Sequence, residues 1–285
     1  MTIQYADLHI HTYYSDGTSS PEEVVQEAIW KGLSCISITD HDVVDAIKPA
    51  MKAAQTHGLE VVPGIELSSE IDGKDIHILG YFFNYTGSVL TEKLESIQQA
   101  RVERMKKMIE KLHGMGMTGI TLEEVCSLTR SRSVGRPHLA RVMLEKKYIS
   151  SIKEAFDKYI GEGRSAYYTK YNQTPFEAID LIKKSGGLAV MAHPMLTQKD
   201  ELIKKFKEAG LDGLEVYYPN CSGEVTRFYE NLAKKYDLLM TGGSDAHGSV
   251  KSYTHVGKMA IPYELVEKMQ QMNQENSKDK IQRSK

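Results

Sequence analysis

The sequence predicts an α/β protein, built as a parallel barrel that a helical insertion interrupts. Three observations indicate this: short apolar runs alternate with capped helical patterns up to Ile65, helical patterns alone fill residues 91–163, and the alternation resumes after residue 164. Strands that alternate with helices are typical of parallel sheets and barrels. The length of 285 residues suits one large barrel or two smaller domains and does not decide between them.

Helix and strand signals follow one another in the first part of the chain. Ser20-Pro21-Glu22-Glu23 combines an N-cap serine, a first-turn proline and a capping-box glutamate, so a helix begins there and runs to Gly32. A strand is expected at residues 35–38, a second helix at 43–58 and another strand at 61–65. Pro63 indicates an irregular or edge position for that last strand.

The dipeptide Asp72-Gly73 stands between two strand-like runs and predicts a hairpin. Glu66 and His77 would then be diagonal neighbours on one face, ~7–8 Å apart at the backbone, and both could reach one metal ion. The expected pairs are Ile71 with Lys74, Ser68 with His77, and Glu66 with Leu79.

Residues 91–163 lack strand-like runs and show helical spacing of apolar residues, with capping boxes at Thr121 and Ser151. We expect them to form a helical insertion. Residues 1–90 and 164–270 would form the barrel, in which a helix opens at Thr174 and strands lie at 188–192, 213–217 and 238–241. The polar, lysine-rich residues 271–285 are expected to form a disordered tail.

Composition excludes some classes of function. Lys+Arg of 36 against Asp+Glu of 38 gives a net charge of −2, so charge that attracts phosphate must be local. Cys35, Cys126 and Cys221 lack the spacing of a disulfide framework or a zinc site, which fits a reducing compartment. No segment approaches the ~20 apolar residues of a membrane span. We expect a soluble cytoplasmic protein without membrane contact, and nothing indicates a protein partner.

Histidines and acids gather where the predicted strands end. His9-Ile10-His11 places two imidazoles on one face of a strand, since side chains two apart point the same way. The carboxyl ends of parallel barrel strands form one mouth, so these distant residues are expected to converge there. The others are Asp16 in a turn, Asp40-His41 and Glu66 at the next strand ends, His193 after residues 188–192, and Asp245-Ala246-His247 after residues 238–241.

Each of these residues also has an ordinary structural interpretation. Asp16-Gly17 alone would be a turn, and Asp245 alone a helix N-cap. Seven of the ten histidines, however, fall at strand ends or helix starts, which chance rarely produces. We interpret His57, His113 and His255 as ordinary core or surface residues.

Several motifs together resemble those of the polymerase and histidinol phosphatase (PHP) superfamily, over nearly the whole chain. They are His9-x-His11, Thr39-Asp40-His41, Pro63-Gly64-Ile65-Glu66, His77-Ile78-Leu79-Gly80-Tyr81, Ala192-His193-Pro194 and Gly243-Ser244-Asp245-Ala246-His247. The insertion, with Gly135-Arg136-Pro137-His138-Leu139-Ala140, resembles a branch of stand-alone enzymes that hydrolyse nucleotides, nucleoside 3′,5′-bisphosphates and short RNA 5′ ends. A substrate-binding role of the insertion is implied by this resemblance.

The resemblance implies a distorted seven-stranded barrel with three divalent metal ions. The implied ligands are His9, His11, Glu66 and Asp245 for the first ion, Glu66, His77 and His193 for the second, and Asp16, His41 and His247 for the third. Imidazole and carboxylate ligands without thiolate fit Mn²⁺, Fe²⁺ or Zn²⁺ and argue against Ca²⁺. Asp40 is expected to orient a neighbouring imidazole, or alternatively to cap a helix.

Charge favours phosphate as the substrate group. Three divalent ions outweigh the three carboxylates, so an anion should bind, and a metal-bridging hydroxide is the expected nucleophile. Arg136 could grip phosphate, and His138 could contact it or protonate the leaving group. Arg136-Pro137-His138 could instead simply begin a helix. Lys170 is a further candidate for substrate contact, and Tyr217 and Tyr218 could stack a base or pack.

Three alternatives remain beside a nucleotide or oligonucleotide phosphoesterase. A histidinol phosphatase would use the same metals, but the helical insertion and residues 135–140 favour nucleotides. A non-catalytic metal-binding module fits poorly with a complete ligand set. Hydrolysis of C–N bonds by an amidohydrolase-like barrel fits poorly with three clustered ion sites. The base, the substrate length, the native metal and the oligomeric state stay open.

Overall fold

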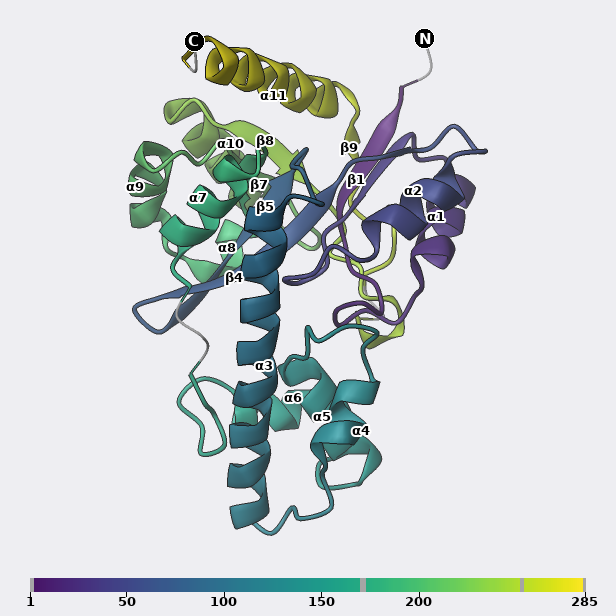
Figure 1. Ribbon diagram of the computed structural model, residues 1–285, viewed down its shortest axis with the longest axis vertical. Helices are drawn as coiled ribbons and strands as arrows, with labels where there is room; N and C mark the ends of the chain where they lie inside the picture. Colours follow the sequence, from purple (N-terminus) through teal and green to yellow (C-terminus); the bar gives the residue numbers. More distant parts are fainter. Residues whose placement is uncertain (1–2, 170–172, 252–253, 284–285) are drawn as a thin grey trace.

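The computed structural model describes residues 3–169, 173–251 and 254–283, and these residues form a mixed α/β protein (Figure 1). One sheet has the strand order β3 (Glu60–Val61), β2 (Cys35–Ile38), β1 (Tyr5–Ile10) and β9 (Ile261–Pro262). The other has the order β4 (Gly64–Ile71), β5 (Lys74–Tyr81), β6 (Leu188–Met191), β7 (Gly213–Tyr217) and β8 (Leu239–Gly242).

The two sheets meet at the carboxyl ends of their parallel strands. β1, β2 and β3 are parallel, as are β6, β7 and β8, while β4 and β5 form an antiparallel hairpin that also pairs with β6. Isolated parallel bridges join Ile10 to Ala246 and His41 to Glu66. The hydrogen-bond ladders therefore form two sheets joined by bridges in a barrel-like arrangement, with the bridges beside the predicted ligands.

Helices cover the outer faces of both sheets (Figure 1). α1 (Pro21–Trp30) and α2 (Ile47–Ala54) pack on the first sheet, and α7 (Pro175–Lys184) packs on β4, β5 and β6. α8 (Pro194–Thr197), the short helix η2 (Asp200–Leu202) and α9 (Ile203–Glu208) come between β6 and β7 in the sequence. α10 (Gly223–Lys235) comes between β7 and β8, and the short helix η3 (Gly248–Lys251) follows β8. Burial of side chains such as Ile65, Ile78 and Phe206 between these layers supplies the hydrophobic stabilisation.

The helical segment begins inside the barrel core and ends in a core of its own. α3 (Ser88–Gly114) contributes Leu90, Leu94 and Ile97 to the main core, and its second half packs with the other helices of the segment. Those are α4 (Leu122–Ser127), α5 (Arg136–Glu145), α6 (Ile152–Ala155) and the π-helix η1 (Phe156–Ile160). One continuous helix thus connects two hydrophobic clusters. In Figure 1, α3 runs from the strands to the other helices of the segment. The division of the chain into a barrel and a substrate-binding insertion stays a prediction.

The predicted register of the hairpin is confirmed. Ile71 pairs with Lys74, Ser68 with His77, and Glu66 with Leu79. Asp72 and Gly73 both have positive φ, 51° and 73°, which is what a two-residue turn of the hairpin type requires. The full capping boxes expected at Ser20 and Thr121 are present, and the helix expected to open at Thr174 has one as well.

Two local features differ from the sequence-based expectation. At Ser151 only half of the capping box forms, because the Glu154 carboxylate accepts from the backbone of Ser150 instead. α2 begins at Ile47, not at residue 43, since Asp42 has a left-handed backbone and its carboxylate accepts from the backbone N–H of Ser68.

The C-terminal segment is helical where we expected disorder. α11 (Glu264–Arg283) runs through most of residues 271–285, anchored by the buried side chains of Val266 and Met269. Its continuation is rich in Gln, Glu and Lys, which propagate a helix once it has begun. Within the described parts of the chain, no helix is both long enough and apolar enough to cross a membrane.

Candidate metal centre

The structure brings all nine predicted ligand residues together at the ends of the strands. Ligand atoms within 4.8 Å of one another form three overlapping groups: His11, Asp16, His41 and His247; His9, His11 and Glu66; and His41, Glu66 and His77. Two further residues adjoin these groups, because His193 Nε2 lies 3.0 Å from Glu66 Oε1 and Asp245 Oδ1 lies 3.3 Å from His11 Nε2.

Glu66 occupies the middle of the cluster and is 1% exposed. Its Oε1 lies 2.8 Å from His77 Nδ1 and 3.0 Å from His193 Nε2. Its Oε2 lies 3.3 Å from His9 Nε2, 3.2 Å from His11 Nε2 and 3.2 Å from His41 Nδ1. Because each oxygen faces a different set of imidazoles, the carboxylate is oriented to bridge two cations.

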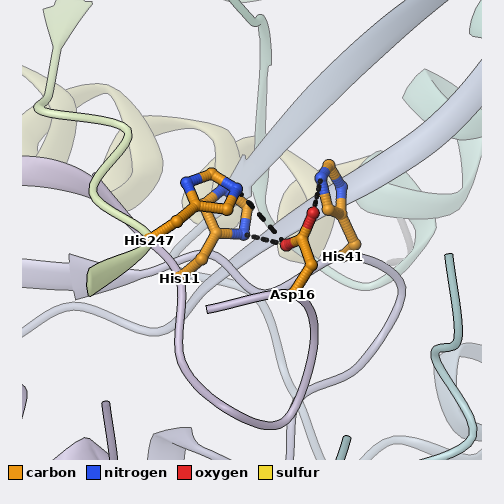
Figure 2. Close-up of side chains that lie close together, drawn as sticks. All are labelled: His11, Asp16, His41 and His247. Carbon is orange, nitrogen blue, oxygen red and sulfur yellow. Dashed lines mark ion pairs between the residues drawn. The ribbon is translucent and has the colours of Figure 1, made fainter. Parts of the chain in front are cut away.

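Asp16 forms the centre of the other end of the cluster. Its Oδ1 lies 3.3 Å from His247 Nε2 and 3.7 Å from His11 Nδ1, and its Oδ2 lies 3.9 Å from His41 Nε2. Figure 2 shows these four side chains pointing toward one another from the turn after β1, the end of β2 and the segment after β8. Residues far apart in the sequence thus surround one small volume.

The donor set fits metal ions because it concentrates lone pairs. His9 Nδ1 lies 2.8 Å from the Glu215 carboxylate, and this contact orients the ring so that Nε2 faces the cluster. The Ser15 hydroxyl donates to Asp40 at 2.6 Å, so its oxygen is free to accept from His11 Nδ1 at 3.4 Å. His9 Nε2 and His11 Nε2 then face each other at 3.1 Å beside two carboxylates, an arrangement that a divalent cation stabilises.

The surrounding charges keep the carboxylates ionised. Burial alone raises the pKa of Glu66, but His41 and His77 outweigh that effect and hold this pKa well below its ordinary value. Asp16 behaves in the same way, with His247 and His41 opposing burial and lowering its pKa.

Two ligand residues have strained backbones. His193 has φ of 27° and Asp245 has φ of 48°, values that non-glycine residues rarely adopt. Each follows a buried strand and turns its side chain back toward the cluster. Strain of this kind persists where the surrounding structure imposes it, and it gathers at functional sites.

Comparison with known proteins identifies the family. The model of the PHP domain matches residues 7–278 of the chain. The chain belongs to the PHP domain family. It is 33% identical over 253 residues to a 5′-3′ exoribonuclease of Haemophilus influenzae, covering 87% of this chain and 91% of that protein.

Two other proteins extend this similarity. The 3′,5′-nucleoside bisphosphate phosphatase of Chromobacterium violaceum is 28% identical over 256 residues, which cover 88% of this PHP chain and 90% of that enzyme. A crystal structure from Bifidobacterium adolescentis, named for a metal-dependent phosphoesterase, superposes with a TM-score of 0.85 at 28% identity. That match covers 93% of this chain and 95% of the other.

Buried acids that sequence reasoning missed hold the PHP ligands in place. Glu215 on β7 is fully buried, and its two oxygens bind His9 Nδ1 and the backbone N–H of His193, each at 2.8 Å. Asp7 accepts from the backbone N–H groups of Ser244 and Gly257, and burial raises its pKa to about 6. A lone acid inside an apolar strand is the signal by which either residue could have been found.

Asp40 does not cap a helix and bonds to no imidazole directly, but it accepts from the Ser15 hydroxyl, whose oxygen lies 3.4 Å from His11 Nδ1. Its carboxylate accepts from the backbone and the hydroxyl of Thr12, at 2.7 and 2.5 Å, and from the Ser15 hydroxyl. The described contacts include no direct hydrogen bond from Asp40 to an imidazole, and α2 begins seven residues further along the chain at Ile47. Asp40 therefore fixes the turn that carries Asp16.

A cavity of about 140 Å³ opens beside the cluster, and its wall includes Asp16, His41 and His77. The same lining holds three arginines: Arg136, which was predicted, and Arg101 and Arg104, which were not. The two missed residues lie on the same face of α3, three positions apart, a spacing that could have revealed them.

The three arginines differ in their partners. Arg136 Nη2 donates to Asp75 at 2.9 Å, and Arg101 Nε donates to Asp42 at 2.8 Å. Arg104 is 9% exposed and donates from Nε to the carbonyl of Tyr168, whereas its buried Nη2 has no hydrogen-bond partner within the described residues. Burial and the neighbouring arginines lower the pKa of Arg104 to about 10, so it stays charged at neutral pH.

The predicted contact of His138 with phosphate does not fit its position. The side chain is 1% exposed, and both ring nitrogens are already bonded: Nδ1 accepts from the backbone N–H of Gly135 at 3.0 Å, and Nε2 lies 2.8 Å from the carbonyl of Ser15. Burial lowers its pKa, which favours the neutral ring. No proton or lone pair is left for a substrate.

The remaining candidate residues lie in different surroundings. Tyr218 lies against the cluster, where its hydroxyl donates to Asp245 Oδ2 at 2.7 Å and its ring meets His193 edge-on. Tyr217 instead donates to Glu230, so it packs away from the cluster. Lys170 lies outside the described residues. His57, His113 and His255 bond locally, as expected of ordinary histidines.

Proposed function

We propose that this PHP protein is a metal-dependent phosphoesterase that hydrolyses esters carrying a second phosphate group, such as nucleoside 3′,5′-bisphosphates or short RNA 5′ ends. The observation that carries the proposal is the shared cavity. Its lining includes the proposed ligands Asp16, His41 and His77 together with Arg101, Arg104 and Arg136. A substrate with two phosphates can place one at the ions and the other among the arginines.

Nine residues would hold three divalent transition-metal ions. His9, His11, Glu66 and Asp245 would bind the first ion, Glu66, His77 and His193 the second, and Asp16, His41 and His247 the third. The two-sided contacts of Glu66 support its role as the bridge between the first and second ions. When bound, the ions supply an activated water for attack on phosphorus and neutralise charge on the phosphoryl oxygens.

The arginines of the chain orient the substrate. Asp75 and Asp42 hold the guanidinium groups of Arg136 and Arg101 at the cavity wall. Arg104 carries a buried N–H that a phosphate oxygen would satisfy, and leaving such a charged donor unpaired is costly. Pre-positioned cations of this kind fix the ester relative to the ions.

The same charges argue against histidinol phosphate as the substrate. That molecule has one phosphate and a cationic amine, so a phosphate at the ions would leave no second anion for the buried N–H of Arg104. The names of the relatives, an exoribonuclease and a nucleoside bisphosphate phosphatase, support nucleotide esters instead.

A panel of substrates tests the proposal with a matched pair of variants. Metal-reconstituted protein should hydrolyse a nucleoside 3′,5′-bisphosphate or a short 5′-phosphorylated RNA faster than a nucleoside monophosphate or histidinol phosphate. Arg104→Gln should raise KM for the first two substrates by about tenfold or more, since a charged hydrogen bond contributes ~1.5–3 kcal/mol. Arg132→Gln, at an exposed position outside the cavity, is the control.

Two results would contradict the proposal. Preference for histidinol phosphate over every nucleotide would assign the site to another substrate. Equal kinetics of Arg104→Gln and wild type on bisphosphate and RNA would show that Arg104 does not contribute to substrate binding.

A further inference from the structure

Residues 129–138 of the helical segment donate a series of hydrogen bonds to two stretches of barrel backbone. The Thr129 hydroxyl lies 3.2 Å from the carbonyl of Tyr13 and 3.0 Å from that of Tyr14, and the Ser131 hydroxyl donates to the latter at 2.6 Å. The backbone N–H of Arg130 donates to Tyr13 at 2.8 Å. Further along, the Ser133 hydroxyl donates to the carbonyl of His41, and His138 reaches the carbonyl of Ser15.

These acceptors all belong to segments that carry Asp16 and His41. Asp16 follows directly after Ser15, while His41 itself offers the carbonyl that Ser133 binds. Both residues belong to the same group of potential ligands, together with His11 and His247. The helical segment therefore supports one end of the metal centre, the end assigned to the third ion.

The hydrogen-bonding state of His138 follows from its two partners. A backbone N–H can only donate, so Nδ1 accepts from Gly135 and holds a lone pair. The proton of the neutral ring is then on Nε2, which donates to the carbonyl of Ser15 at 2.8 Å. The first bond caps the start of α5, and the second crosses from α5 to the turn after β1.

We propose that His138 is a positioning residue for the third ion site: through its Nε2–H it fixes the Ser15 carbonyl and so the direction of the Asp16 carboxylate. This rests on the proposed three-ion centre but not on the identity of the substrate. Arg136 lies two residues before His138 in the same first turn of α5. The helix start that presents Arg136 to the cavity thus also organises a metal ligand.

Two substitutions separate the cap of α5 from the link to Asp16. His138→Asn places its amide oxygen where Nδ1 lies and keeps an acceptor for Gly135, but it is too short to reach Ser15. His138→Gln places its amide nitrogen near the position of Nε2 and keeps the donor to Ser15. The readouts are the number and affinity of Mn²⁺ ions per chain at equilibrium, and the melting temperature of the ion-free protein.

The expected result is that His138→Asn binds one ion about 10–100-fold more weakly than wild type, the usual effect of losing a hydrogen bond that orients a ligand. His138→Gln should bind all ions with nearly wild-type affinity, and the order of melting temperatures should not follow the order of ion affinity. Ser133→Ala should weaken the same ion, whereas Ser127→Ala, whose hydroxyl bonds only within α4, should not.

Wild-type ion binding by His138→Asn would overturn the proposal. Equal loss of ions by both His138 variants, together with an equal loss of stability, would show that the residue has only a structural role. That result would also overturn the proposal. Ions are counted without substrate, so failure of the protein to hydrolyse nucleotides would refute the proposed function while leaving this inference intact.

Discussion

Glu66 and His77 face each other across adjacent strands, with Oε1 2.8 Å from Nδ1, although the ladder pairs Glu66 with Leu79 and His77 with Ser68. The contact is diagonal, and both side chains come from one rigid hairpin. Two ligands of the proposed second ion are therefore held by regular backbone hydrogen bonds and not by loops. A side chain fixed in this way needs little reorganisation when it binds an ion.

Replacement of His77 should remove the second ion. His77→Ala is expected to lower ion content by one and reduce hydrolysis by at least ~100-fold, because the second ion helps to activate the attacking water. Circular dichroism should stay unchanged, and exposed His57→Ala is the control. Full ion content in His77→Ala would show that the residue is not a ligand.

The three-ion centre predicts the metal content of the protein. Elemental analysis after gentle purification should find more than two transition-metal ions per chain. Removal of the ions by a chelator should abolish hydrolysis and lower the melting temperature, since ligands that bind only the folded state stabilise it by ~2.7 kcal/mol at one hundred times their Kd. A stoichiometry of one or none after reconstitution would refute the three-ion proposal.

Glu215 should act through His9. In Glu215→Gln, the amide can face His9 Nδ1 with its oxygen or its nitrogen, so it no longer fixes the proton on that ring nitrogen. The affinity of the first ion should therefore fall by ~10–100-fold. Isothermal titration with Mn²⁺ measures this. Glu230→Gln, which alters the partner of Tyr217, should bind ions normally. An unchanged affinity in Glu215→Gln would assign that acid to packing alone.

Arg136 is expected to act on substrate without affecting the ions. Arg136→Ala should raise KM for phosphate esters by about tenfold or more with the ion content unchanged, because a charge-assisted bond to phosphate is lost. Steady-state kinetics and elemental analysis on the same preparation measure both quantities. Unchanged kinetics on every nucleotide substrate would mean that Arg136 only begins α5.

Gly243 should matter for stability because it packs against β1. A Cβ at this position would overlap the backbone of His9, so Gly243→Ala should cost ~1–3 kcal/mol of unfolding free energy. Gly114→Ala meets no atom within 4 Å and should be neutral or slightly stabilising. Urea denaturation compares the two variants, and equal stability would show that β1 can shift to accommodate the methyl group.

Features with a local cause could be predicted from the sequence. The Asp72-Gly73 turn sets the hairpin register because its two residues accept positive φ, and the side-chain period of two then places Glu66 and His77 on one face. The capping boxes at Ser20, Thr121 and Thr174 involve residues three apart. The extent of α11 was predicted less well, because composition alone does not reveal that Val266 and Met269 are buried.

The sequence by itself therefore determined the α/β class, the hairpin and the set of residues that meet at the strand ends. Only the tertiary structure decided which partners complete the site: Glu215 behind His9, Arg101 and Arg104 in the cavity beside the cluster, and His138 joined to Ser15 instead of to substrate. The physical reason is the distance along the sequence between the residues that interact. Turns, caps and strand faces follow from neighbouring residues, whereas a contact between His138 and Ser15 exists only because a helical segment packs back on the turn after β1.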